Sequence, residues 1–172
     1  MRQSHYSMKP QDVVVLLKII ALNNNNWQQI PLAQSLKMSQ SEVSQSVARS
    51  KYAGLLDDSG KGVMRQALMD FLQYGLAVVF PVKPGAVVRG IPTAHSTAPL
   101  NKEISSGEDY VWPFAKGNVR GHGITPLYAS VPQAAMDDEQ LHALLALADA
   151  LRIGKAREKN IAVQELKKRI CE

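Results

Sequence analysis

The chain has 172 residues, of which 45% are hydrophobic and 20% charged, a composition typical of an ordinary soluble protein. The longest apolar run, Val13–Ile20, is too short to cross a bilayer and includes Lys18. The lone Cys171 has no partner for an internal disulfide. The first ten residues carry no secretory signal pattern, so we expect a cytoplasmic protein that does not bind membranes.

The net charge of +5 and the pI near 9.4 are not spread evenly along the chain. Residues 1–75 contain eight Lys or Arg against five Asp or Glu, and residues 76–136 contain five against three. The last 36 residues are balanced at seven of each. This distribution favours a polyanionic partner, modestly, for the first three quarters of the chain.

In chain order, the first predicted helix covers Pro10–Leu22, because proline is favoured at the first helical position and Asp12 complements the helix dipole. Its apolar residues cover nearly the whole circumference, so it should be buried. The four asparagines at 23–26 end the pattern. A shorter helix is predicted over Pro31–Lys37.

The next helix has the most complete start signal in the chain. Ser39 followed by Glu42 forms the capping-box pattern S-x-x-E, and the flanking Met38 and Val43 match a hydrophobic staple. We therefore predict a helix over Gln40–Ala53 with Gly54 as its C-terminal cap.

The remainder is predicted to contain short helices and strands. The expected elements are a polar turn at Asp57–Gly62, a helix over Val63–Gly75, a β-hairpin of Leu76–Pro81 with Ala86–Ile91, an extended connection over Pro92–Asp109, one or two short strands in 110–128, and helices over Asp137–Arg152 and Ala156–Ile170.

The segment Leu32–Leu56 resembles the DNA-binding segment of bacterial winged helix-turn-helix transcriptional regulators, whose loose pattern is "LAxxLxxSxxxVSxxVxxxxxxGLL". The residues that fit it are Leu32, Ala33, Leu36, Ser39, Val43, Ser44, Val47, Gly54, Leu55 and Leu56. Lys37 departs from the family, in which glycine is common at this turn. The resemblance implies binding of double-stranded DNA, although winged helices also serve as protein-interaction modules.

With Val43 and Val47 facing inward, the outward face of this helix should present polar side chains, among them Gln40, Gln45 and Arg49. An α-helix fits the major groove, where glutamine can pair with adenine and arginine with guanine. The predicted DNA-binding residues are Gln40, Ser44, Gln45 and Arg49 as base readers, Ser39 at the cap, and Ser41 and Lys51 nearer the phosphates. The alternative is a polar face that only meets solvent.

Two turns are candidates for the wing. If the predicted hairpin forms it, Lys83 lies at its tip and Arg89 on its returning strand, and both count among the predicted DNA-binding residues. If the turn at Asp57–Gly62 forms it, Lys61 takes the place of Lys83.

The rest of the chain resembles, as a set, the tails of small bacterial regulators encoded with partners such as toxins or nucleotidyltransferases. The stretches that carry this likeness are "RGIPTAHSTAPL", "VRGHGITPLY" and "LLALADALRIGKAREK". It implies a tail that binds protein and, as an alternative function, an antitoxin-like module that neutralises an operon-encoded enzyme. Because one winged helix reads few base pairs, we also expect a homodimer through the C-terminal helices.

Catalysis and cofactors are not expected. His95, His122 and Ser96 lack a nucleophile-elbow pattern, and "GNVRGHG" lacks the lysine and helix context of a phosphate loop. The scattered histidines do not form a zinc pattern.

These expectations combine into an α+β, mostly α-helical fold. The predicted parts are a winged helix-turn-helix domain over 1–92, an extended connection with short strands over 93–136, and a C-terminal helix pair over 137–172.

Overall fold

The computed structural model describes residues 6–172, and they form the α+β, mostly helical fold that the sequence predicts. Residues 1–5, on which part of the expectation about a secretory signal rests, lie outside the described residues. The helices are α1 (Pro10–Leu22), α2 (Gln29–Leu36), α3 (Gln40–Tyr52), α4 (Arg65–Tyr74), α5 (Leu76–Val79), α6 (Val131–Met136), α7 (Glu139–Ile153) and α8 (Ala156–Cys171). The strands are β1 (Val87–Pro92), β2 (Tyr110–Pro113) and β3 (Val119–Gly123), and 3-10 turns cover Ala94–Ser96 and Leu100–Lys102.

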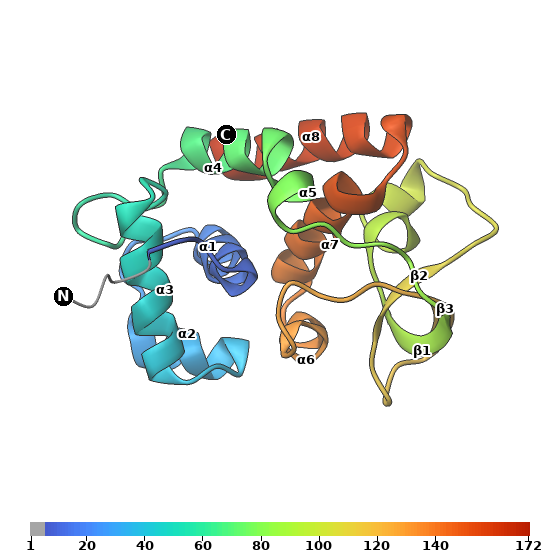
Figure 1. Cartoon of the computed structure of the whole chain (residues 1–172), viewed down its shortest axis with the longest axis horizontal. Helices are drawn as coiled ribbons and strands as arrows, with labels where there is room; N and C mark the ends of the chain where they lie inside the picture. The colour runs from blue at the N-terminus through green and yellow to red at the C-terminus, as the bar shows by residue number, and fades with distance from the viewer. Residues whose placement is uncertain (1–5) are drawn as a thin grey trace.

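The three N-terminal helices lie at one end of the molecule and the sheet lies at the other (Figure 1). Helix α7 stands between them, and α4 packs beside α8 along one edge. Within the described residues, no helix combines the length and apolar character needed to cross a membrane.

Helix α1 has the predicted bounds. Its start is capped by Asp12, whose carboxylate accepts the Lys9 backbone N–H at 2.8 Å. Its end is a left-handed Asn23, with φ of 52°, a conformation that asparagine tolerates. The apolar residues from Val13 to Leu17 are all fully buried, as expected for a helix that is apolar on all sides.

The turn between α2 and α3 places Lys37 in the left-handed region, with φ of 56°. Glycine adopts this conformation most easily, and here the backbone N–H of Lys37 still caps α2. The predicted capping box at Ser39 and Glu42 is confirmed. Buried Val43 then directs the inner face of α3 towards α1 and α2.

The predicted hairpin of Leu76–Pro81 with Ala86–Ile91 is wrong. Residues 76–79 form the short helix α5, which packs on α7 and buries Leu76, and β1 pairs with β2 and β3 instead. The β-branched residues of this run favoured a strand, but the core contact of Leu76 decides the local conformation.

A tighter hairpin forms at the polar turn. Leu56 and Val63 make an antiparallel bridge, and the Asp57 N–H donates to the Gly62 carbonyl at 2.8 Å. Of the two turns considered as a wing, this one follows α3 directly.

The three strands close on one another. β1 runs antiparallel to both β2 and β3, which are parallel to each other, so the sheet is a small closed barrel. Space inside it is minimal: a Cβ on Gly90 would lie 1.9 Å from the Trp112 carbonyl oxygen, and one on Gly121 would lie 2.5 Å from that of Asp109. The two arginine-glycine segments are therefore places of close backbone packing.

The C-terminal helices belong to the same core as the N-terminal ones. The apolar side chains of α7, including Leu141, Leu144 and Leu145, are buried against α1, α5, α6 and α8. The apolar face on which the predicted C-terminal dimer depended is therefore covered within one chain.

A buried carboxylate joins α7 to the sheet. Asp149 is 1% exposed and accepts hydrogen bonds from Thr93 Oγ1 and Trp112 Nε1, both at 2.7 Å, and from Arg152 at 3.0 Å. Burial raises the pKa of Asp149, while Arg152 acts in the opposite direction. This arrangement holds the barrel against the central helix.

Candidate nucleic-acid interface

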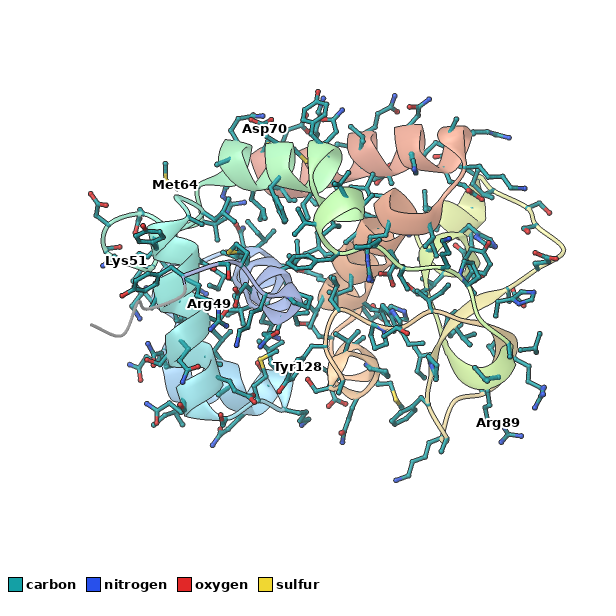
Figure 2. The ribbon with its side chains drawn as sticks, in the orientation of Figure 1. Arg49, Lys51, Met64, Asp70, Arg89 and Tyr128 are labelled. Atoms are coloured by element: carbon teal, nitrogen blue, oxygen red, sulfur yellow. The ribbon has the colours of Figure 1, made fainter. Side chains whose placement is uncertain are left out.

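Helix α3 has one continuous polar arc that faces solvent. At 100° per residue, its exposed residues fall within less than half a turn of the helix. They are Gln40, Ser41, Ser44, Gln45, Ala48, Lys51 and Tyr52. Lys51 points away from the C-terminal helices, on the outer side of α3 (Figure 2). The structure thus brings together the predicted residues Gln40, Ser41, Ser44, Gln45 and Lys51 on one surface, and exposed Ser39 adjoins it at the N-cap.

Arg49, however, is not on that surface, and the prediction that it lies on the outward face of α3 is wrong. It is 6% exposed, and its Nε and Nη2 bind the two carboxylate oxygens of Asp12 at 2.8 and 2.7 Å. The hydrogen bond to Asp12 raises the pKa of Arg49. Arg49 lies at the border of the exposed arc, and fully buried Asp12 turns its side chain inward.

The N-terminal end of α3 is held by a residue from far along the chain. The hydroxyl of Tyr128 donates to the Glu42 carboxylate at 2.8 Å. The hydroxyl of Ser130 donates at 2.6 Å to the carbonyl of Leu36, the last residue of the preceding helix α2. The bond to Glu42 raises the pKa of Tyr128. Sequence reasoning missed this contact because no local pattern links Tyr128 to a helix 86 residues away.

The predicted wing residues Lys83 and Arg89 are not beside α3. Arg89 and Lys51 lie at opposite ends of the molecule (Figure 2), and Lys83 lies in the coil that leads into β1. Because the 76–91 hairpin does not form, neither residue has the position expected for a wing.

The hairpin at 57–62 does lie next to α3, but its lysine is already engaged. The Nζ of Lys61 donates to the Trp27 carbonyl at 2.5 Å and lies 4.2 Å from the centre of the Trp27 ring. The same turn carries Asp57 and Asp58, and a hydrogen bond from Ser59 lowers the pKa of Asp57. This hairpin is therefore unsuited to strong phosphate contacts.

No protein family, curated protein or solved structure gives a significant match to this chain. The surface of α3 and its chemistry are therefore what a functional proposal rests on.

The residues considered for catalysis have structural contacts. His95 Nε2 lies 2.7 Å from the Glu108 carbonyl, and the Ser96 hydroxyl accepts the Tyr110 N–H at 2.8 Å. His122 Nδ1 lies 3.0 Å from the Gly85 carbonyl. In the part of the chain that the structure describes, no three His, Cys, Asp or Glu residues gather into a metal-binding group.

A cavity of about 790 Å³ opens elsewhere, between the end of α1 and helices α7 and α8. Its lining mixes apolar residues such as Ile20 and Leu144 with Glu139, His142 and Arg169. His142 is engaged by the Pro92 carbonyl at 2.7 Å. None of the predicted DNA-binding residues lines this cavity.

Proposed function

We propose that the protein is a transcriptional regulator that binds double-stranded DNA and reads its sequence with α3. The observation that carries this proposal is the polar arc of α3, which contains two glutamines and two serines within one accessible face. Amide side chains can pair with adenine edges, and short hydroxyl side chains let a helix sit deep in the major groove.

The contacts that hold α3 in place are those expected of a helix that reads DNA bases. Its first turn is fixed by the Ser39–Glu42 cap and by Tyr128, and its inner face is tied to α1 through Asp12 and Arg49. A base-reading surface needs side chains on a rigid element, because small displacements break the hydrogen bonds that discriminate bases.

One observation favours the alternative, a module that docks on a protein partner. Among the exposed residues of the arc, Lys51 alone is positively charged. The neighbouring hairpin carries two acidic residues, Asp57 and Asp58. DNA affinity depends on phosphate neutralisation, so this surface alone would bind weakly. In addition, the ring of Tyr52, which is 74% exposed, stacks on Tyr6 with centroids 4.5 Å apart, which places aromatic surface at the end of α3.

Selection from a pool of randomised duplexes separates the two proposals. A DNA-reading protein should enrich one motif and bind it about 10³-fold or more tightly than scrambled DNA at physiological salt. The stoichiometry on the selected duplex then shows whether one or two copies bind. Repeated rounds that enrich no motif would favour the protein-docking alternative.

A further inference from the structure

Two arginines face each other across the outer surface of the barrel. In the antiparallel ladder of β1 and β3, Arg89 lies directly opposite Arg120, and both side chains are exposed. Directly opposed residues of such a ladder point to the same face, with their Cβ atoms about 4.5–5.5 Å apart. Within residues 6–172, neither guanidinium has a carboxylate within 4.0 Å or a hydrogen-bond partner of its own.

This pairing opposes the stability of the sheet. Like charges directly opposite destabilise a strand pair, whereas an Arg–Glu pair would stabilise it. The barrel itself explains only why both side chains point outward. The adjacent positions, Gly90 and Gly121, face an interior that has no room for a Cβ. The geometry of the barrel does not explain why both outward positions hold arginine.

Two further cations flank the pair. Lys116 adjoins Gly117, whose backbone lies against Gly90 at one end of the ladder. Lys83 lies at the other end, where the N–H of Gly85 donates to the Gly123 carbonyl. Both lysines are exposed. The arginine pair therefore has one exposed lysine near each end of its ladder.

We propose that the Arg89–Arg120 pair binds neighbouring phosphates of a nucleic-acid backbone, at a site separate from α3. The planar guanidinium donates two parallel hydrogen bonds to a phosphate, and two such groups side by side suit a repeating chain of phosphates. Backbone contacts of this kind need no base reading.

The closed barrel argues against an acidic protein segment as the occupant. Extended peptides gain affinity by adding a strand to a free sheet edge. Here each strand pairs with both others, so peptide docking would rely on side chains alone.

This site does not depend on the function proposed for α3. Arg89 and Lys51 lie at opposite ends of the molecule (Figure 2), so the two surfaces can be tested separately. A chain with both would hold two nucleic-acid segments at once.

The test measures the salt dependence of binding by the full chain to two fluorescent probes, a 20-base-pair duplex of scrambled sequence and a 20-nucleotide oligothymidine. For Arg89→Ala/Arg120→Ala, the slope of log K against log salt should fall in magnitude by about 1.4–1.8 for at least one probe, because each of the two lost phosphate contacts removes about 0.7–0.9. The matched control is Lys159→Glu, which alters an exposed lysine on α8 and should leave the slope unchanged.

A second variant guards against an effect of folding. Arg120→Glu should weaken binding about fivefold or more at low salt, yet its Tm should equal or exceed that of the native chain, because the introduced carboxylate would face the opposite charge of Arg89. Neither probe requires base reading by α3, so failure of the proposal for α3 is distinguished from failure of the proposal for the arginine pair. An unchanged slope for both probes in the double alanine variant, or equal competition by polyglutamate at matched charge, would overturn the proposal.

Discussion

Asp12 and Arg49 form a fully desolvated ion pair between α1 and α3, with two hydrogen bonds of 2.8 and 2.7 Å. Asp12 is 0% exposed and Arg49 6%. The charge of each group compensates that of the other, so removing either one leaves a buried charge with no opposite charge beside it. Such a loss costs more than the net contribution of the intact pair.

Replacing Arg49 with alanine should therefore lower the free energy of unfolding by about 3–5 kcal/mol. Urea denaturation followed by circular dichroism measures it. The pair replacement Asp12→Leu/Arg49→Met should recover much of the loss, because both charges are then absent. A loss below about 1 kcal/mol in Arg49→Ala would contradict the burial of this pair.

Two serines of α3 oppose its stability in a different way. The hydroxyls of Ser46 and Ser50 are buried without a hydrogen-bond partner among the described residues. We expect Ser46→Ala or Ser50→Ala to raise the free energy of unfolding by about 0.5–1.5 kcal/mol, since alanine removes an unsatisfied group and favours the helix.

Exposed Ser44 on the same helix supplies the control. Ser44→Ala gains only the difference in helix propensity, a few tenths of a kcal/mol. Equal gains at all three positions would show that burial of the two hydroxyls has no cost.

At the scale of elements, local patterns predicted the helices well. The bounds of α1 match, and α3 begins at Gln40 as expected, because a proline and a capping box act within one turn of the chain. The failures at Leu76–Val79 and Arg49 depend on partners distant in sequence, namely α7 and Asp12. Such partners leave no periodic signal nearby, although a lone acid in an otherwise apolar helix indicates a buried cation.

Asp138 links two elements, since it caps α7 and binds Lys18 of α1 at 2.6 Å. Burial acts to raise its pKa, but the bonds from Lys18 and the Leu141 N–H outweigh burial, and the pKa is lowered. The folded state therefore holds the proton of Asp138 less tightly than the unfolded state does. The stability that the ionised carboxylate contributes is present at pH values above its ordinary pKa of 3.8 and is lost as the pH falls below that value.

Asp138→Asn should thus cost about 1–3 kcal/mol at pH 7 and clearly less at pH 3. Urea unfolding at both pH values measures the difference. Asp137→Asn is the control, because its carboxylate is 69% exposed and lies 3.8 Å from Lys37, so its effect should be small at both. A pH-independent cost for Asp138→Asn would contradict a contribution from the charge of this carboxylate, since asparagine can still cap the helix.

At the scale of the whole molecule, α7 is the centre around which both ends are built. Among the N-terminal helices, α1 packs directly against α7. The barrel is joined to α7 by the hydrogen bonds that Thr93 and Trp112 donate to Asp149. This arrangement leaves the outer arc of α3 at one end and the Arg89–Arg120 pair at the other. The sequence predicted the first surface from a family pattern, whereas the second depends on strand register that no local pattern encodes.

The most direct test of the central proposal compares variants on a duplex selected from the randomised pool. Gln40→Ala/Gln45→Ala should weaken binding to that duplex by about 1–3 kcal/mol and leave its affinity for scrambled DNA unchanged. Gln164→Ala, an exposed glutamine on α8, should change neither. If the double variant binds the selected duplex as tightly as the native chain does, α3 is not the helix that reads DNA.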